Sequence, residues 1–464
     1  MAAGREHLRS ATLRIPIGFG ASTDEVLQRA YRSYSDEFGT IQGRAADKLA
    51  LVRQFDVLGM NRAMSICHCG GSGSLLAASY LDNHPDIVIL PMLTSTYIYP
   101  FFHVYPSLSV WEKLVAYPTY SGLKSSLDGG LIRNSDGDFF QKDNPTGDFA
   151  IDAADYYASV HALYEIYSER PPAWLDARPR FFQFLYVAFA AAAGRRLENP
   201  RPLMVHAQHW FNQELAERFI EDFPNGKFIH TIRDPISGLD SWFERKLDME
   251  MHRENHRPDL AVQYFDPAVA TNLDLVARDW DRAHRGMESR SRAIRFEDMH
   301  LALEPTMRRL AEWLDIPYCP SMLESTWNGT PYVVRIRGVA WCGPNPANAQ
   351  RRWKNLGLTD RLVLFALLHN NFMAWNYPSP KALHRFWMRL CIIALFWIVP
   401  MKMELKNARV VLQLQALPNL RRGRFGFAFG APVFLLKRRL RMMLLIAAAG
   451  RSRLVGNRPP LKLV

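Results

Sequence analysis

The sequence predicts an α/β fold in which a parallel sheet is flanked by helices. Three observations predict it: short apolar β-runs, segments of helical periodicity between them, and glycine or proline at the ends of the runs. Strands that alternate with helices usually form a parallel sheet covered on both faces. A length of 464 residues fits one large α/β domain with additions, or two domains.

The N-terminal part of the chain is predicted to be helical. Ser22, Thr23 and Asp24 offer N-caps, and apolar residues recur at helical spacing over residues 23–58. A strand then follows, and the later elements are expected in this order: strand 63–67, helix 75–81, strand 86–90, strand 202–206, helix 213–223, strand 227–232, helix 236–245, strand 293–296, helices 304–314 and 359–375.

Residues 92–200 interrupt this alternation. They are rich in Tyr, Phe, Pro and Gly, with a polar loop at 128–144 and a helix expected at 179–193. We interpret them as a mostly helical insertion over the sheet, where ligand specificity can reside.

Positive charge is concentrated at the C-terminus. Residues 381–464 hold 17 lysines and arginines and one acidic residue, Glu404, whereas the other 380 residues hold 40 basic and 44 acidic residues. Apolar stretches at 390–401 and 425–436 are shorter than the roughly 20 residues that a membrane-spanning helix needs. This basic amphipathic tail is expected either to lie on an anionic membrane surface or to pack on the domain or a second copy of the chain. Aliphatic runs are poor partners for phosphate backbones, so no nucleic acid is expected.

These patterns predict three parts and a cytoplasmic location. The parts are an N-terminal helical segment (1–60), an α/β domain (61–380) and the tail (381–464). Five cysteines without a CxxC pair predict neither a disulfide framework nor a structural zinc site. The first 30 residues hold no apolar core of signal-peptide length, so we expect a cytoplasmic protein, peripheral at the membrane if the tail binds lipid.

A glycine loop, CGGSGSLL, joins the strand at 63–67 to the helix that follows it. Glycines let backbone N–H groups converge, and the helix N-terminus adds a positive end, which together suit phosphate or sulfate. A plain turn is the alternative interpretation. No lysine follows the last glycine, which disfavours an ATP- or GTP-hydrolysing loop. The residues of this candidate anion site are Gly70, Gly71, Ser72, Gly73, Ser74 and Leu75.

The stretch KFIHTIRDPISGLDSWF (227–243) contains a second candidate site. The β-run ends at Arg233, which can bind a phosphate through its guanidinium fork, and Ser241 follows eight residues later with a hydroxyl donor. The alternative is a structural one, with Asp234 as the N-cap of a helix, Pro235 at its first position and a surface arginine.

Taken together, GGSGSLL with LDNHP (81–85) and FP with KFIHTIRDP and the later serine (223–241) resemble the sulfotransferase family. IRFEDM (294–299) fits the same pattern, and RIRG (335–338) and RRWK (351–354) resemble the family's last nucleotide-binding segment, which adds Arg335 and Arg337. The resemblance covers roughly residues 60–90 and 200–376. It implies a P-loop-like nucleotide-binding fold in which the early loop holds the 5′-phosphosulfate of 3′-phosphoadenosine 5′-phosphosulfate. Arg233 and Ser241 would then hold its 3′-phosphate.

The resemblance also implies a reaction, sulfuryl transfer to a hydroxyl or amine of a carbohydrate, lipid or small-molecule acceptor that binds the 92–200 insertion. Many members have Arg or Lys where Gly71 stands, so backbone N–H groups, Arg62 or Lys354 would have to meet the phosphosulfate charge. The rival interpretations are a small-molecule kinase and a non-catalytic nucleotide-binding relative. A homodimer is a further expected assembly.

Sulfuryl transfer needs one general base and a cluster of donors, with no obligatory metal. The stretch VHAQHW (205–210), at the end of the strand at 202–206, offers His206 and His209. Histidine titrates near neutrality, so either one could accept the hydroxyl proton of the acceptor. The alternative for each is a structural histidine.

Overall fold

The computed structural model describes most of the chain in separate stretches. These are residues 15–68, 72–90, 97–127, 151–208, 213–238, 240–241, 286–336, 339–350, 353–354, 356–400, 412–426 and 461–464, with a few single residues and pairs between 402 and 444. Gly70, Gly71, His209, Arg337 and the expected polar loop at 128–144 lie outside the described residues, as do half of the helix expected at 236–245 and most of the second apolar stretch of the tail.

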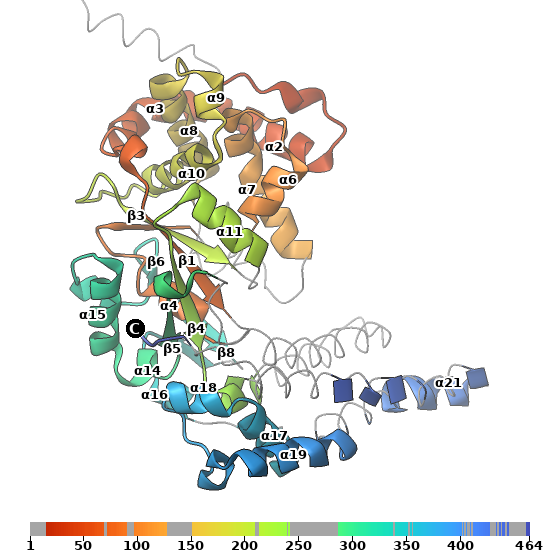
Figure 1. Cartoon of the computed structure of the whole chain (residues 1–464). Helices are drawn as coiled ribbons and strands as arrows, with labels where there is room; N and C mark the ends of the chain where they lie inside the picture. The colour runs from red at the N-terminus through yellow and green to blue at the C-terminus, as the bar shows by residue number, and fades with distance from the viewer. Residues whose placement is uncertain are drawn as a thin grey trace, which may run out of the picture. The chain divides into compact units, whose positions relative to one another are not determined.

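Within the described part of the chain, five strands form one sheet in the order β2-β3-β1-β4-β5 (Figure 1). β3 pairs in parallel with β1, where Met204 faces Ala63, and with β2, where Leu203 faces Ile87. The predicted parallel sheet flanked by helices is therefore confirmed, with strand ends shifted by up to two residues. The strands are β1 (Ala63–His68), β2 (Ile87–Ile89), β3 (Leu203–Gln208), β4 (Lys227–Ile232) and β5 (Ser291–Arg295).

The connections explain the position of the glycine loop. β1 is the middle strand and leads through this loop into the short helix α4 (Ser74–Ser79). β3 leads into α11 (Gln213–Asp222), and α11 leads into β4 beside β1. Parallel strands need such helical crossovers, and their carboxyl ends are where open α/β sheets bind ligands.

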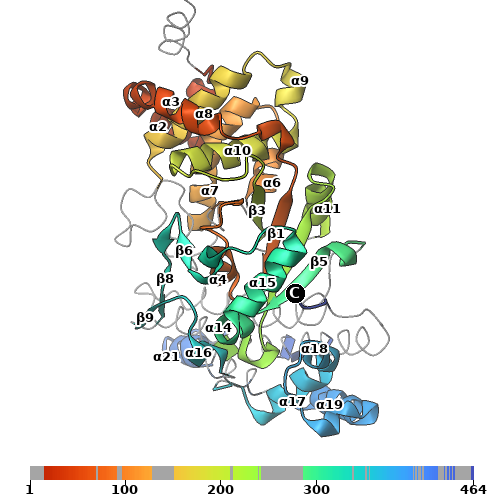
Figure 2. The ribbon, with the colours of Figure 1, turned by 90° about the vertical axis from the view of Figure 1, so that its left-hand side faces the viewer.

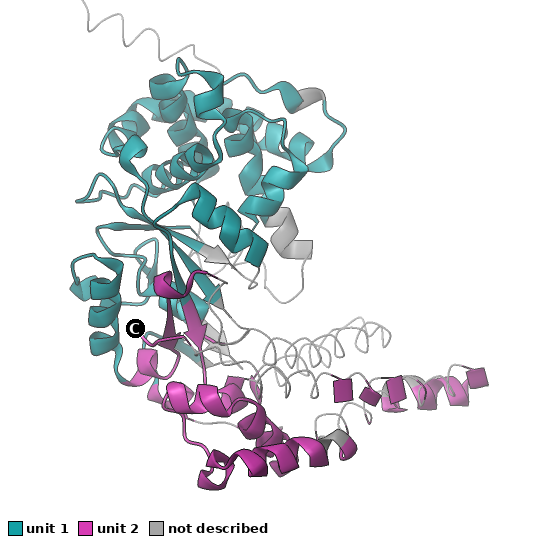
Figure 3. Ribbon diagram, in the orientation of Figure 1, with its two compact units in different colours: residues 1–67, 74–229, 302–345 teal, residues 68–73, 230–301, 346–464 magenta. Residues whose placement is uncertain are grey.

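The chain divides into two compact units (Figure 3). Unit 1 comprises residues 1–67, 74–229 and 302–345, and unit 2 comprises residues 68–73, 230–301 and 346–464. Each unit combines segments that are distant in sequence. The division expected at residues 60 and 380 stays a prediction, because compactness does not test which parts fold independently.

The helices of unit 1 pack into one group that joins the N-terminal segment to the insertion. Figures 1 and 2 both place α3 beside α8. The Tyr34 hydroxyl lies 2.7 Å from His161 Nε2, and Lys48 Nζ donates to the carbonyl of Ala191. The insertion is mostly helical, as predicted. These helices are α2 (Glu25–Asp36), α3 (Phe38–Val52), α6 (Ile98–Val104), α7 (Val110–Leu127), α8 (Ala153–Tyr167), α9 (Pro172–Leu175) and α10 (Arg178–Ala192).

The later elements follow β5. The helix expected at 359–375 is two helices, α17 and α18, that break at Leu368. None of the described helices is both long and apolar enough to span a bilayer. The elements are α14 (Asp298–Leu301), α15 (Leu303–Leu314), β6 (Thr326–Trp327), β7 (Thr330–Pro331), β8 (Val333–Ile336), β9 (Val339–Cys342), α16 (Pro346–Ala349), α17 (Leu358–Leu367), α18 (His369–Ala374), α19 (Phe386–Ile398) and α21 (Leu417–Arg421).

Candidate functional site

The end of the glycine loop is joined to the end of β4 inside unit 2. Ser72 Oγ lies 2.8 Å from Thr231 Oγ1, and both side chains are buried. A buried hydroxyl pair of this kind satisfies two polar groups at once. The pair therefore fixes the loop beside the strand that ends at Arg233.

Gly73, near the end of this loop, has tight surroundings. Its φ is +82°, and a Cβ built there would lie 2.4 Å from Phe296 Cδ2 and 2.9 Å from Cε2. Side chains other than hydrogen are strained at this φ and have no room here. Glycine is thus required because the loop backbone lies directly against the ring of Phe296.

Arg233 lies against the same ring. It is 6% exposed, and its guanidinium carbon is 4.4 Å from the centroid of Phe296. Its Nη2 also points to the carbonyl of Asn348 at 3.5 Å. The ring attracts the cation and holds the guanidinium plane. Phe296 therefore contacts both the glycine loop and Arg233.

The turn after β4 is a helix cap, as the structural interpretation predicted. Asp234 Oδ1 accepts a hydrogen bond of 2.9 Å from the N–H of Ser237, and the helix starts at Pro235. The same turn nevertheless contains a buried arginine, not a surface one. Capping by Asp234 and burial of Arg233 coexist in adjacent residues.

Glu297 holds the backbone of this turn. Its Oε1 accepts from the N–H of Asp234 at 2.9 Å, and its Oε2 accepts from the hydroxyl of Tyr377 at 2.6 Å. Burial raises the pKa of Glu297 above its ordinary value, and the Tyr377 hydrogen bond opposes that rise. His300 stands against Phe296, with ring centroids 4.5 Å apart, and burial lowers the pKa of His300 to about 4.

His206 lies in unit 1 among aromatic rings. Its ring stacks on Phe219 and makes edge contacts with Tyr99 and Phe182. It is buried, Nδ1 has no hydrogen-bond partner, and burial lowers the pKa of His206 to about 3. A neutral imidazole in such surroundings is a packing residue first, and its role as a base stays a prediction.

The described part of the chain also contains four other predicted binding residues, Ser74, Leu75, Ser241 and Arg335. Ser74 is buried at the start of α4, directly followed by Leu75, and Ser241 is helical and half-buried. Arg335 belongs to β8 in unit 1, where it pairs with Ala340. The structure thus brings together Ser72, Gly73 and Arg233 in unit 2.

Arg62, one candidate for the missing loop cation, has other contacts. Its Nη2 donates to the carbonyls of Leu314 at 2.8 Å and Asp315 at 2.7 Å, at the end of α15. Cations at a helix C-terminus satisfy its last carbonyls and interact favourably with its dipole. Arg62 therefore caps a helix. Lys354, the other candidate, is exposed in unit 2.

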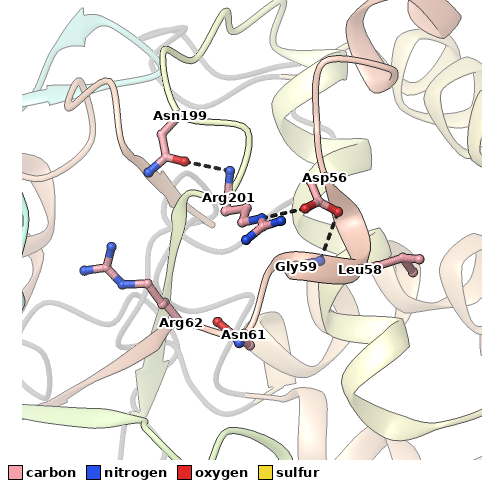
Figure 4. A pocket seen from close by; sticks show the side chains of 7 residues that line it. All are labelled: Asp56, Leu58, Gly59, Asn61, Arg62, Asn199 and Arg201. Atoms are coloured by element: carbon pink, nitrogen blue, oxygen red, sulfur yellow. Dashed lines mark hydrogen bonds and ion pairs between the residues drawn. The ribbon is translucent and has the colours of Figure 1, made fainter.

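A hollow of about 520 Å³ opens beside Arg62 in unit 1 (Figure 4). Arg201 Nε pairs with Asp56 Oδ2 at 2.5 Å in its wall. Arg62 lines it, whereas the described residues of the glycine loop, Arg233 and Ser241 do not. Its lining residues are Asp56, Leu58, Gly59, Asn61, Arg62, Asn199 and Arg201.

The LDNHP motif has a structural role in unit 1. The buried Asp82 accepts from Thr326 Oγ1 and the N–H of Gly329, both at 3.1 Å, and lies 3.6 Å from Arg195. Burial raises the pKa of Asp82. The motif therefore holds the segment after α4 to the β6–β7 hairpin.

Three contributors to the site were not predicted by sequence reasoning: Phe296, Glu297 and Tyr377. Phe296 and Glu297 belong to the IRFEDM motif, which fits the sequence pattern described above, but the contacts of their side chains depend on the fold. In the stretches that the structure describes, no group of three or more His, Cys, Asp or Glu side chains could hold a metal ion.

The chain was compared with solved structures, with curated proteins and with protein families. The sulfotransferase domain from the curacin biosynthetic pathway is similar over 72% of this chain and 97% of its own, at 15% identity and a TM-score of 0.32. The crystal structure of sulfotransferase STF9 from Mycobacterium avium is similar over 69% of this chain and 84% of its own, at 15% identity and a TM-score of 0.27. No curated protein matches the chain. The profile of the sulfotransferase family matches residues 67–320, more than half of the sequence, and the chain belongs to this family.

Proposed function

We propose that this transferase moves a sulfuryl group from 3′-phosphoadenosine 5′-phosphosulfate to a hydroxyl or amine of a carbohydrate, lipid or small-molecule acceptor. One observation carries the proposal. The ring of Phe296 lies against Gly73 of the glycine loop and against Arg233, the two groups expected at opposite ends of the donor. The Ser72–Thr231 pair adds a second link between the same segments.

The proposed roles follow from the chemistry of each segment. The backbone N–H groups of the glycine loop are proposed to bind the phosphosulfate, and Arg233 and Ser241 the 3′-phosphate. The acceptor oxygen or nitrogen attacks sulfur, and its proton passes to a base. The bond from sulfur to the bridging oxygen breaks, and the electron pair stays on the bisphosphate product. Donors aimed at that oxygen stabilise the charge that develops there.

The base is assigned to the end of β3 and the residues that follow it. His206 and His209 are its candidates, and the aromatic surroundings of His206 favour His209. A base works best with a pKa near the working pH, whereas the pKa of His206 is about 3. Turnover lost in His209→Ala with unchanged nucleotide affinity would support this assignment.

The test is binding of adenosine 3′,5′-bisphosphate, measured by calorimetry and by thermal shift against ATP and GTP. Ligands bound to the native state raise the melting temperature by mass action. Loss of a charge-assisted hydrogen bond costs about 2–3 kcal/mol, so Arg233→Ala should bind about 30- to 150-fold more weakly.

Arg201→Ala is the matched control, because Arg201 is exposed and pairs with Asp56 in unit 1. It should leave nucleotide affinity unchanged. Equal affinity in Arg233→Ala contradicts the proposal, and metal-dependent ATP turnover would identify a kinase instead. Tight binding without transfer to any acceptor would identify a non-catalytic relative.

A further inference from the structure

Helix α19 has one face packed on unit 2. Ile393 is buried in a core that includes residues of α17, and Ile392 and Val399 are partly buried against the same core. Figures 1 and 2 both show α19 beside α17. Packing on its own unit therefore accounts for this half of the first apolar stretch of the tail.

The opposite face of α19 is an exposed apolar stripe, which we define as Trp387, Cys391, Leu395 and Ile398. Trp387 is 72% exposed, Leu395 53% and Ile398 75%, and Cys391 is also exposed. Their spacing of four, four and three residues puts them on one face of a helix. Large exposed apolar groups in a continuous row mark an interaction surface.

Basic side chains flank the stripe. No acidic residue occurs from Lys381 to Lys402, a range that also contains Arg385 and Arg389. Arg439 Nη2 donates to the carbonyl of Val399 at 3.0 Å, which brings a later basic segment to the end of α19. The partner must therefore offer negative charge around an apolar interior, as the headgroups and acyl chains of an anionic bilayer do.

The tail returns to unit 2 at its far end. Trp375 Nε1 donates to the carbonyl of Leu461 at 3.1 Å, and Leu461 is buried. The N–H of Ala293 in β5 donates to Lys462, and the N–H of Val464 donates back to Ala293. α19 has 13 residues and is about 20 Å long, which is shorter than a hydrocarbon core of about 30 Å. With both ends of the tail held on unit 2, α19 can lie along a membrane surface without crossing it.

We propose that the apolar stripe of α19 inserts into the surface of an anionic lipid bilayer, with the flanking arginines and lysines on its phosphate headgroups. This places the chain at a membrane independently of which donor or acceptor it uses. We infer a lipid partner because the tail contains 17 basic residues and one acidic residue. Packing against a neutral protein surface would not require so large a positive charge.

The first test is co-sedimentation of the full chain with vesicles of phosphatidylglycerol and phosphatidylcholine in equal parts, and with phosphatidylcholine alone. Binding should require the anionic lipid and should weaken as salt rises from about 0.1 M to about 0.5 M. The double variant Trp387→Ser/Ile398→Ser should bind at least about tenfold more weakly, because it removes the two most exposed apolar groups of the stripe. Leu358→Ser, at an equally exposed leucine of α17 in unit 2, is the matched control and should bind like wild type.

The second test uses the native thiols. Cys391 on the stripe and Cys342 in unit 1 are the exposed cysteines in the described part of the chain. A polarity-sensitive dye on Cys391, in a Cys342→Ser chain, should shift to the blue with the anionic vesicles. The dye on Cys342, in a Cys391→Ser chain, should not.

Three outcomes would overturn the proposal. The wild type does not bind the vesicles, the double variant binds them as tightly as the wild type, or the wild type is a dimer and the double variant is a monomer. The last would mean that a second copy covers the stripe. An unchanged thermal shift with adenosine 3′,5′-bisphosphate in the double variant separates this test from that of the proposed function.

Discussion

Replacing Gly73 by alanine tests the contact between the glycine loop and Phe296. The new Cβ would sit 2.4 Å from Phe296 Cδ2, so the ring or the loop must move. The left-handed backbone costs about 1 kcal/mol with a side chain, and overpacking a filled site adds about 1–3 kcal/mol. We expect the free energy of unfolding to fall by about 2–4 kcal/mol, measured by urea unfolding. Displacement of Phe296 should also disturb Arg233 and weaken nucleotide binding.

The variant Gly194→Ala separates the backbone cost of a side chain at positive φ from the steric cost of overpacking. Gly194 follows α10 with φ +67°, but no atom lies within 4 Å of its Cβ position. It should lose only the backbone cost of about 1 kcal/mol and keep its nucleotide affinity. Combining Gly73→Ala with Phe296→Ala should recover the steric part in a double-mutant cycle. Two results together would refute a close contact between Gly73 and Phe296. Gly73→Ala and Gly194→Ala would lose the same free energy of unfolding, and the effects of Gly73→Ala and Phe296→Ala would be additive.

Three further variants test buried groups by urea unfolding. The pKa of His206 is about 3 in the folded chain and near 6.5 in the unfolded chain, so only the unfolded state takes up a proton between these values. The stability of the wild type relative to His206→Leu should therefore fall as the pH drops from 6.5 toward 3, and a difference that does not change with pH would contradict the burial of His206. Burial raises the pKa of Glu297 above 4.5 in the folded chain, so the unfolded state loses its proton at a lower pH. The stability of the wild type relative to Glu297→Gln should therefore fall as the pH rises from 4.5 through the folded-state pKa, and a rise in stability over this range would contradict the raised pKa. Asp82→Ala leaves the charge of Arg195 buried and should cost about 3–5 kcal/mol, a loss below about 1 kcal/mol being inconsistent with a buried pair.

Local patterns predicted the elements well where periodicity was strong. The strand at 227–232 has the predicted ends, and the Asp24 side chain accepts from the N–H groups of Val26 and Leu27 as an N-cap. The break between α17 and α18 at Leu368 was not predictable, because the apolar pattern continues through it. The bridge between Leu463 and Ala293 joins segments about 170 residues apart, and no local signal encodes such a pairing.

The predicted site shows the same division between local and tertiary information. Glycine spacing identifies Gly73, which has a positive φ, and the RDP turn, capped by Asp234, identifies Arg233. A position near the end of a strand makes His206 and His209 candidate bases, but sequence position does not reveal that Tyr99, Phe182 and Phe219 surround His206. Burial is a tertiary property, and it decides whether a histidine can accept a proton at neutral pH.

The end of β5 explains how two distant segments reach one place. Phe296 and Glu297 form the turn between β5 and α14, and their side chains contact different partners. Phe296 lies against Gly73 and the guanidinium of Arg233, whereas Glu297 accepts from the backbone N–H of Asp234. One dipeptide thereby fixes both the side chain of Arg233 and the backbone that follows it.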